Sequence, residues 1–307
     1  MAGYEDKYWW SQDGLRLHYR DYPGRDDRPP ILCLPGLTRN ARDFEAVADR
    51  LAGDWRIICV ELRGRGESAY AKDPMSYVPL VYLQDIGALL EELAVPKIIG
   101  FGTSLGGIML MLIAATRRGC LAGALLNDIG PDLAPEGLAR IQKFVGTGSA
   151  QPTWVHAARA VAELQGMIYP KYRLADWLRY AKRLYRLTSQ GRIVLDYDQR
   201  IAEPFRVPGG AAGVDLWPAY KAFGDLPLTL LRGELSDLLA PETARAMEAS
   251  LPQLDLVTVP GVGHTPTLEE PDSVAAIDRL LARIEAVPGE TALSEPGRIE
   301  TGPGPGP

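Results

Sequence analysis

The sequence predicts an α/β fold with a mostly parallel central sheet, flanked by helices and interrupted by an inserted helical cap. Short, nearly continuous apolar runs occur at residues 31–34, 57–60, 98–101, 122–126, 228–231 and 256–259. Such runs are typical of strands buried on both faces. Segments with apolar residues three and four apart separate these runs. Strands alternating with helices predict a parallel sheet with right-handed crossovers.

The individual elements follow from these patterns. Between Leu15 and Tyr19, apolar residues alternate with Arg16 and His18. This alternation, followed by a stretch rich in Pro, Gly and Asp, predicts an exposed antiparallel strand at the start of the sheet. Helical periodicity is clearest at residues 44–51, 82–93, 105–117 and 273–285.

The strand pattern lapses over residues 131–218, where helical stretches rich in Trp, Tyr, Arg and Lys replace the short aliphatic runs. We interpret this segment as a cap inserted into one core, which comprises residues 1–130 and 219–285. Residues 286–307 consist largely of Pro, Gly and Glu. Such a composition cannot bury enough apolar surface to offset its ordering entropy, so we expect a disordered tail.

Composition excludes several classes of protein. The 307 residues include 33 Lys and Arg against 39 Asp and Glu, giving a formal net charge of -6. A nucleic-acid-binding domain is held by a basic surplus that this chain lacks. Apolar residues make up 46% of the chain, which excludes a protein disordered throughout. The length fits one main domain with an insertion.

The sequence predicts a cytoplasmic protein without a membrane partner. Its first residues lack the basic and apolar regions of a signal peptide. The longest apolar stretch near the middle, residues 106–116, is about half the length that spans a bilayer. Cys33, Cys59 and Cys120 stand among aliphatic residues, without a second Cys or His at metal-ligand spacing. We therefore expect free thiols, no metal site and no cofactor.

The strongest chemical signal is the G-T-S-L-G sequence at residues 102–106, directly after an apolar run and at the start of a helix. The G-x-S-x-G pattern places a strained serine, here Ser104, at the tip of a sharp turn. The flanking glycines let neighbouring backbone pass without a β-carbon clash. A structural serine in a tight turn is the alternative for an isolated motif. The stretch also resembles a dinucleotide fingerprint, but it follows an internal strand and lacks the matching acidic residue.

Two further polar residues follow later strands. Asp237 comes after the run at 228–231, and His264 comes after the run at 256–259. The carboxyl ends of parallel strands form the ligand-binding edge of an open α/β sheet. We therefore expect Ser104, Asp237 and His264 to act together, with His264 as base. Asp128, after the run at 122–126, is the alternative acid, although we expect it to fix the start of the cap.

The other two histidines have less suitable positions. His18 alternates with arginines on the strand predicted to be exposed, and His156 lies within the cap. Neither follows a predicted core strand, whereas His264 lies in a loop between glycines and a Thr-Pro pair. This difference favours His264.

Taken together, these motifs resemble the α/β-hydrolase fold family, and in particular its capped serine hydrolases such as carboxylesterases and ring-cleavage-product hydrolases. The resemblance covers nearly all of residues 15–285. L-P-G-L at residues 34–37 resembles the oxyanion loop, and E-L-R-G-R-G-E-S at 61–68 resembles the turn after the fourth strand. Residues 263–271 are similar to the histidine loop. Pro35 departs from the His-Gly pair that is frequent in this family, but backbone donors do not depend on that side chain.

The resemblance implies a mechanism. Ser104 would be the nucleophile, His264 the base and Asp237 the acid, with the backbone N–H groups of Leu37 and Leu105 as oxyanion donors. It implies a hydrolase of carboxylic esters with small to medium acyl groups, using neither metal nor cofactor. A carbon–carbon bond hydrolase and a lactonase are alternatives on the same triad, and a non-catalytic ligand receptor is a third. Epoxide hydrolases and haloalkane dehalogenases are disfavoured, since they carry an aspartate where Ser104 stands.

Substrate-binding residues are expected near these motifs. Arg39 and Asn40 follow the oxyanion loop, and Thr103 precedes the nucleophile, so all three are candidates for the pocket. The basic stretch at residues 171–186 of the cap has two interpretations. It forms a solvated face, which we expect, or one of its arginines binds a substrate carboxylate. The predicted partner is a small-molecule ester or related acyl compound, with no nucleic acid.

Overall fold

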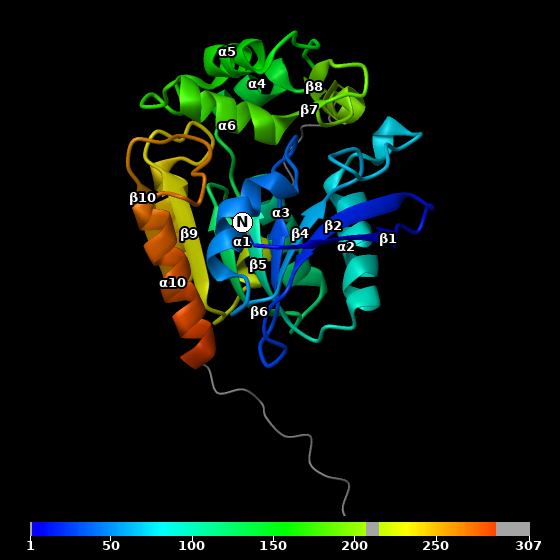
Figure 1. Ribbon diagram of the computed structural model, residues 1–307. Helices are drawn as coiled ribbons and strands as arrows, with labels where there is room; N and C mark the ends of the chain where they lie inside the picture. The colour runs from blue at the N-terminus through cyan, green and yellow to red at the C-terminus, as the bar shows by residue number, and fades with distance from the viewer. Residues whose placement is uncertain (1, 207–214, 287–307) are drawn as a thin grey trace, which may run out of the picture.

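An eight-stranded sheet forms the centre of the computed structural model, which describes residues 2–206 and 215–286. The strand order is β1-β2-β4-β3-β5-β6-β9-β10 (Figure 1). The strands are β1 (Glu5–Trp10), β2 (Arg16–Tyr22), β3 (Ile31–Leu34), β4 (Ile57–Glu61), β5 (Ile98–Thr103), β6 (Leu121–Asn127), β9 (Leu228–Gly233) and β10 (Leu254–Val259). β2 pairs antiparallel with β1 and β4, and all other pairs are parallel. The predicted fold class is confirmed.

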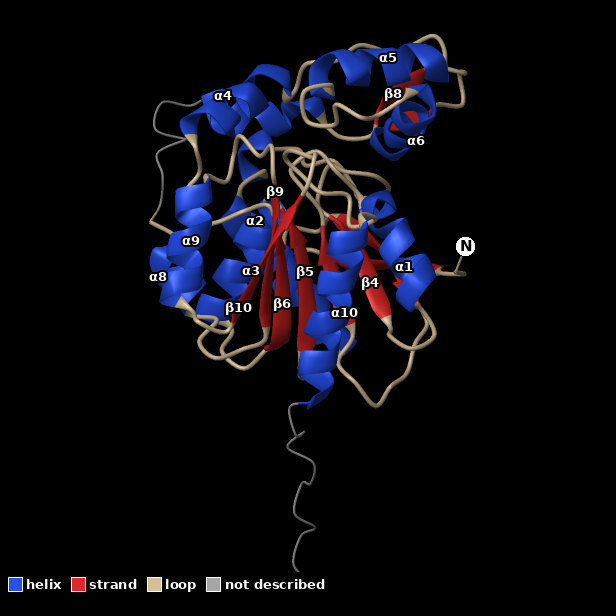
Figure 2. Cartoon of the chain, turned by 90° about the vertical axis from the view of Figure 1, so that its left-hand side faces the viewer, coloured by secondary structure: helices blue, strands red, loops and turns tan. Residues whose placement is uncertain are grey.

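Helices cover both faces of the sheet, as Figure 2 shows. One face carries α2 (Pro79–Leu93), α3 (Leu105–Thr116), α8 (Trp217–Lys221) and α9 (Pro241–Ser250). The opposite face carries α1 (Glu45–Leu51), which follows the short helix η1 (Ala41–Phe44), and α10 (Pro271–Ala286). Because β3, β4 and β5 are covered on both sides, every residue in them is buried. This burial explains their continuous apolar sequences.

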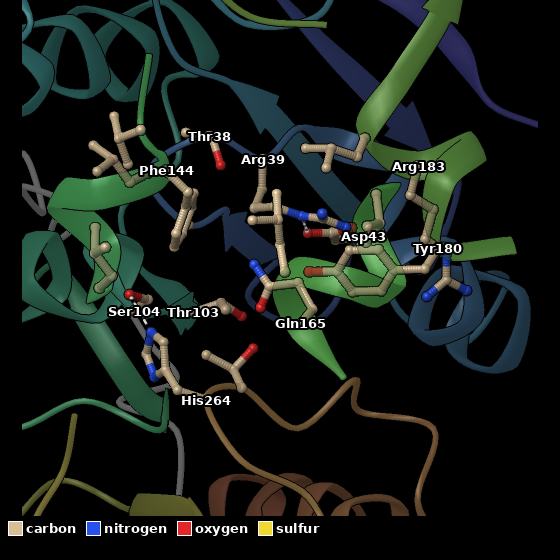
Figure 3. Close-up of a pocket in the computed structure, with 18 of the residues that line it drawn as sticks. Thr38, Arg39, Asp43, Thr103, Ser104, Phe144, Gln165, Tyr180, Arg183 and His264 are labelled. Atoms are coloured by element: carbon tan, nitrogen blue, oxygen red, sulfur yellow. Dashed lines mark hydrogen bonds and ion pairs between the residues drawn. The ribbon is translucent and has the colours of Figure 1, made fainter. Parts of the chain in front are cut away.

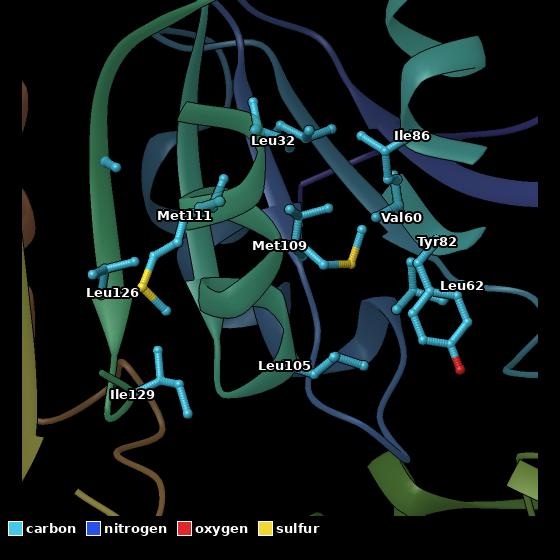
Figure 4. Packing of buried hydrophobic residues seen from close by; sticks show 14 of the residues in the cluster. Leu32, Val60, Leu62, Tyr82, Ile86, Leu105, Met109, Met111, Leu126 and Ile129 are labelled. Carbon is cyan, nitrogen blue, oxygen red and sulfur yellow. The ribbon is translucent and has the colours of Figure 1, made fainter. Parts of the chain in front are cut away.

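The larger apolar core lies between the sheet and α2 and α3 (Figure 4). Met109 and Met111 of α3 are fully buried there, beside Leu126 of β6 and Val60 of β4. Burial of one such side chain stabilises the fold by about 1.5–3 kcal/mol. α3 therefore starts from a firmly held position, which matters because its first residue adjoins Ser104.

Elements from the segment interpreted as a cap lie above the carboxyl edge of the sheet (Figures 1 and 2). They are α4 (Pro135–Phe144), α5 (Trp154–Gln165), α6 (Leu174–Leu184), the hairpin β7 (Tyr185–Leu187) and β8 (Ile193–Leu195), η3 (Gln199–Ala202) and α7 (Glu203–Arg206). They include a small core of their own, with Val161, Trp177 and Tyr185. The sequence did not predict the hairpin, because three-residue strands are too short to show alternation.

The predicted end of the cap, after residue 218, falls within a helix. α8 begins at Trp217 and packs against α3, so the last residues assigned to the cap lie on the main body. Residues 287–307 of the expected tail lie outside the described residues.

The first strands differ from expectation. The sequence did not predict β1, which pairs with β2 along its whole length and helps to bury His18. His18 is 1% exposed, with Nδ1 2.9 Å from Glu61 and Nε2 2.9 Å from Asp6. The antiparallel direction of β2 is confirmed, but the prediction that His18 lies on an exposed face is wrong.

Two further observations concern the cysteines and the helices. Cys33, Cys59 and Cys120 are free thiols. Burial raises the pKa of the Cys33 thiol, which lies opposite Cys59 on the neighbouring strand. Among the helices of residues 2–206 and 215–286, none combines the length and the apolar character needed to cross a bilayer.

Candidate active site

Ser104 lies at the sharp turn between β5 and α3. Its backbone has φ 53° and ψ -114°, a conformation that costs a non-glycine residue about 1–3 kcal/mol. A β-carbon at Gly102 would lie 2.6 Å from the backbone of Gly106, and one at Gly106 would lie 2.0 Å from the carbonyl oxygen of Leu34. The two glycines are therefore required by close backbone contacts, as the motif predicts.

His264 faces this serine from the loop between β10 and α10. Its Nε2 lies 2.9 Å from Oγ of Ser104 (Figure 3). The cap holds the loop in place: the Tyr169 hydroxyl donates to the carbonyl of Thr265 at 2.6 Å, and the Gly263 N–H donates to the carbonyl of Ile168 at 2.8 Å. The imidazole is thus positioned by both the sheet and the cap.

Asp128 contacts the other nitrogen of this imidazole. Its Oδ2 lies 2.7 Å from Nδ1 of His264, and its side chain is fully buried. Oδ1 accepts the Gly233 N–H at 2.9 Å, and Oδ2 also accepts the Ser236 hydroxyl at 2.7 Å. The Asp128 backbone has φ 55°, in the left-handed region where Asp is enriched among non-glycine residues. This carboxylate is therefore fixed by partners from two other loops.

The prediction that Asp237 contacts His264 is wrong. Both Asp237 carboxylate oxygens accept hydrogen bonds from Arg140 of α4, at 2.5 and 2.8 Å, and the side chain is 35% exposed. Burial raises the pKa of Asp237, but the hydrogen bonds and charge of Arg140 outweigh it and hold the pKa below its usual value. The loop after β9 directs Ser236 toward Asp128 and leaves Asp237 facing the cap.

Strand order explains this correction. β6 is the direct neighbour of β5, whereas β9 is one strand further from the nucleophile. Asp128 comes directly after β6 and Asp237 comes four residues after the end of β9. The signal that could have favoured Asp128 is its immediate position after an apolar run.

Of the two predicted oxyanion donors, Leu105 directly follows Ser104, and Leu37 lines the same pocket as Ser104 and follows Gly36, where a β-carbon would lie 3.8 Å from Cβ of Ser104. Leu105 is the first residue of α3, where a helical N–H has no partner within the helix. The Gly36 carbonyl accepts the Arg39 N–H at 3.1 Å, and this turn directs the Leu37 N–H of the same peptide unit the opposite way. In the described part of the chain, neither the Leu37 nor the Leu105 N–H makes another hydrogen bond. Both are available to a ligand.

A pocket opens over Ser104, between the sheet edge and the cap (Figure 3). It encloses about 1160 Å³ when its open mouth is included. Phe144 lies on the side of Ser104, and Arg39, Tyr180 and Arg183 lie across the pocket. Its apolar lining includes Ile141, Phe144, Val145, Val161, Leu184 and Leu195. The site therefore offers an apolar region and a polar region to one ligand.

The three predicted substrate-binding residues have different outcomes. Arg39 and Thr103 line the pocket, and the Thr103 hydroxyl accepts a hydrogen bond from Asn127 at 3.2 Å. Asn40 does not line it. Asn40 is fully buried, accepts the Arg42 N–H as the cap of η1 and donates to the Arg183 carbonyl at 2.9 Å. The prediction for Asn40 is wrong, because a helix-capping role orients its side chain away from the pocket.

The arginines of the pocket are already paired. Arg39 pairs with Asp43 and lies over the Tyr180 ring, with 4.5 Å between its guanidinium carbon and the ring centre. Arg140 pairs with Asp237, and Arg183 donates to Glu269 at 2.6 Å. Of the basic residues at 171–186, Arg183 alone lines the pocket formed by the described residues. Sequence patterns missed Arg140 and Tyr180, which carry no motif.

Metal ligands are not clustered in the part of the chain that the structure describes: it contains no group of three His, Cys, Asp or Glu residues that could hold a metal ion.

Comparisons with known proteins show which family this chain resembles. A model of the alpha/beta hydrolase family matches residues 31–277. A 3-hydroxybutyrate-oligomer hydrolase from Cupriavidus necator is 33% identical over 277 residues, covering 85% of this chain and 90% of the relative. A 2-(acetamidomethylene)succinate hydrolase from Mesorhizobium japonicum is 30% identical over 237 residues, covering 77% of this chain and 81% of the relative. The crystal structure of an alpha/beta hydrolase from Novosphingobium aromaticivorans superposes with a TM-score of 0.89, at 57% identity, covering 92% of this chain and 99% of that chain.

Proposed function

Because the chain belongs to the alpha/beta hydrolase family and is a hydrolase, we propose that it cleaves carboxylic esters of small to medium acyl groups through an acyl-enzyme on Ser104. The observation that carries this proposal is the continuous chain of contacts from Ser104 through His264 to Asp128. A nucleophile, a base and an orienting acid within hydrogen-bond reach are the parts that acyl transfer requires.

The proposed reaction has two halves. Ser104 Oγ attacks the acyl carbon while Nε2 of His264 takes its proton, and Asp128 stabilises the imidazolium through Nδ1. The Leu37 and Leu105 N–H groups bind the negatively charged oxygen of the tetrahedral intermediate, each worth about 3 kcal/mol of barrier. The intermediate expels the alcohol, which receives the proton from His264. Water, deprotonated by His264, then attacks the acyl-enzyme and releases the acid.

The state of the pocket arginines supports a neutral ester. Arg39, Arg140 and Arg183 each have a carboxylate partner in the structure. A substrate carboxylate would have to compete with these pairs, whereas a neutral acyl group would leave them intact. The relative from Cupriavidus necator acts on 3-hydroxybutyrate oligomers, as its name says. Such an oligomer is joined by ester bonds, so this name supports ester cleavage, but a linear oligomer also ends in a free carboxylate. From the pairing of the arginines we favour short neutral esters of hydroxy acids, whose acyl part is small and whose further oxygens suit the polar side of the pocket.

A second candidate is the hydrolysis of an anionic substrate on the same triad, including carbon–carbon cleavage. Three arginines around one pocket and the relative named for a substituted succinate favour this alternative. It requires at least one arginine to leave its carboxylate partner when substrate binds. Lactone hydrolysis is a variant of the first proposal, since a lactone is an intramolecular ester.

One panel of substrates tests these proposals. p-Nitrophenyl esters of two to eight carbons, the methyl ester of a 3-hydroxybutyrate dimer, a lactone and a dienoate diketone are assayed together, with the Ser104→Ala variant as the background control. We expect the highest kcat/KM for a short ester and no turnover by the variant. A kcat/KM for the diketone that exceeds every ester would replace ester hydrolysis by carbon–carbon cleavage.

A further inference from the structure

Arg65 is a buried cation that the proposed mechanism does not use. Its side chain is fully buried in the turn after β4. Nε and Nη2 donate to the Leu37 carbonyl at 2.9 and 2.7 Å, Nη1 donates to the Arg63 carbonyl at 2.6 Å, and Nη2 also reaches the Tyr82 hydroxyl at 3.1 Å. Within residues 2–206 and 215–286, Arg65 forms no ion pair with a carboxylate.

The neighbouring Arg63 shows how this fold otherwise accommodates a buried arginine. Arg63 is 1% exposed and donates two hydrogen bonds to Asp85 and two to Asp13. Arg65 has neutral oxygens and the rings of Tyr77 and Tyr82 instead, with ring centres 5.6 and 4.9 Å from its guanidinium carbon. A buried charge is costly unless it is compensated. The Arg65 charge is therefore a feature that packing alone does not explain.

The position of this charge suggests its use. The guanidinium donates two hydrogen bonds to the carbonyl of Leu37, the residue whose N–H is one of the two proposed oxyanion donors. The carbonyl oxygen and the nitrogen of one residue are about 3 Å apart, so the guanidinium lies within roughly 6 Å of that N–H. A negative charge appears there only in the tetrahedral states of the reaction. Because Arg65 is fully buried, solvent screens its charge little, and a cation at this range stabilises those states more than the bound ester.

We propose that Arg65 is a positioning residue for the oxyanion site: it fixes the Leu37 peptide and places a permanent positive charge behind it. This inference rests on the proposed acyl transfer. The same turn also contacts the cap, because Gly66 N–H donates to the Asp196 carbonyl at 3.0 Å and Asp198 N–H donates to the Gly64 carbonyl at 2.7 Å. Arg65 thus links the oxyanion loop to the turn after β4, and hydrogen bonds from the cap hold that turn in place.

The test compares Arg65→Lys, which keeps the charge, with Arg65→Gln, which keeps a hydrogen-bond donor and loses the charge. The matched control is Arg283→Gln. Arg283 also donates to two backbone carbonyls, those of Leu228 and Gln253, but at the opposite end of the sheet. For each protein we would measure kcat and KM for a p-nitrophenyl ester, the affinity for a trifluoromethyl ketone that forms a tetrahedral adduct on Ser104, and the thermal midpoint.

We expect Arg65→Gln to lower kcat by about 100-fold, the lower end of the loss seen for a direct oxyanion donor, with KM within about three-fold. Adduct affinity falls by a similar factor. Arg65→Lys should lower kcat and adduct affinity by about 10-fold each, because the lysine ammonium retains the charge but not the two hydrogen bonds to one carbonyl. Arg283→Gln keeps the kcat and adduct affinity of the wild type. A folded Arg65→Gln variant with wild-type kcat would overturn the proposal, and equal losses for Lys and Gln would overturn the role of charge.

Two further arms keep the result interpretable. If Arg65→Gln fails to fold, Arg65→Lys decides alone, since wild-type kcat and adduct affinity in that variant would overturn the positioning role. The rate of fluorophosphonate labelling of Ser104 is followed in every protein. A wild type that is labelled but hydrolyses no ester would defeat the ester assignment, and the labelling rates would still support or overturn the role of Arg65.

Discussion

Oδ2 of Asp128 lies 2.7 Å from Nδ1 of His264, so the carboxylate that orients the imidazole comes from the end of β6. Three other features fix this contact: the Gly233 N–H, the Ser236 hydroxyl and the left-handed backbone of Asp128 itself. A carboxylate that accepts several hydrogen bonds is held in one orientation. This arrangement is suited to fixing one tautomer of the histidine.

The first prediction compares the two aspartates. We expect Asp128→Asn to lower kcat by about 10⁴-fold, because the amide no longer favours the required tautomer or stabilises the imidazolium. Asp237→Asn, the matched control, should lower kcat by less than about ten-fold, since Asp237 contacts Arg140 and not the imidazole. The measurement is kcat for p-nitrophenyl acetate, with circular dichroism to establish folding. The opposite ranking in two folded variants would reassign the acid to Asp237.

The second prediction concerns the nucleophile. Ser104→Ala should lower turnover by roughly four to six orders of magnitude, as the loss of the attacking oxygen does in other triad enzymes. The fold should persist, because alanine places the same β-carbon in the turn. A fluorophosphonate probe should label the wild type once and leave the variant unlabelled, as read by intact-protein mass spectrometry. Labelling of the variant at the wild-type rate would move the nucleophile elsewhere.

The parts of this site that sequence predicts are those with local signals. The turn around Ser104 has glycines at fixed offsets, and His264 lies in a short loop after a strand, so both could be located without knowledge of the sheet. Continuous apolar runs likewise predict the buried strands. These features depend on neighbours within a few residues.

The acid, by contrast, depends on tertiary relationships. Asp128 and Asp237 both follow apolar runs, and the choice between them rests on which strand pairs with β5 and which way each loop points its side chains. Arg65 and Asn40 lie near predicted motifs, but contacts with distant parts of the sequence set their roles. Arg65 contacts the carbonyl of Leu37, and Asn40 contacts the carbonyl of Arg183 in the cap. No local pattern encodes such contacts.

The third prediction tests the packing of the elbow. We expect Gly106→Ala to destabilise the protein by about 3 kcal/mol or more, because the new β-carbon would lie 2.0 Å from the Leu34 carbonyl oxygen and backbone must move. Gly3→Ala is the control, since nothing lies within 4 Å of a β-carbon there. Urea unfolding gives both free energies. A Gly106→Ala protein as stable as the control would refute the close contact.

The fourth prediction is a pH dependence of stability. Burial lowers the pKa of His18, but hydrogen bonds and charge from Glu61 and Asp6 outweigh it and raise the pKa above the ordinary 6.5. A raised folded-state pKa means that the added stability is fully present below about pH 6.5 and is lost as pH rises through the folded pKa. Wild type should therefore exceed His18→Gln in unfolding free energy by more at pH 5 than at pH 9. Urea unfolding at both values measures this, and a difference that grows with pH would contradict it.

The last prediction uses substrate charge to separate the two proposed functions. Phenyl butyrate and phenyl hemisuccinate have the same scissile ester, but the second carries a carboxylate. Because Arg39, Arg140 and Arg183 are paired with carboxylates, we expect kcat/KM for the neutral ester to be at least as high as for the acidic one.

Measuring the two esters at low and high salt separates attraction by exposed charges from a contact with a buried arginine. Raising ionic strength from about 0.05 to 0.5 M shortens the Debye length to a few ångströms and removes attraction by exposed charges, while a buried clamp keeps its effect. Variants Arg39→Met and Arg183→Met are compared with Arg179→Met, whose side chain is 69% exposed and pairs with Asp176 away from the pocket. A preference for the acidic ester that survives salt and disappears in one of the pocket variants, but not in Arg179→Met, would favour the anionic-substrate alternative. Such a result would mean that the arginine exchanges its carboxylate partner for the substrate, which the neutral-ester proposal excludes.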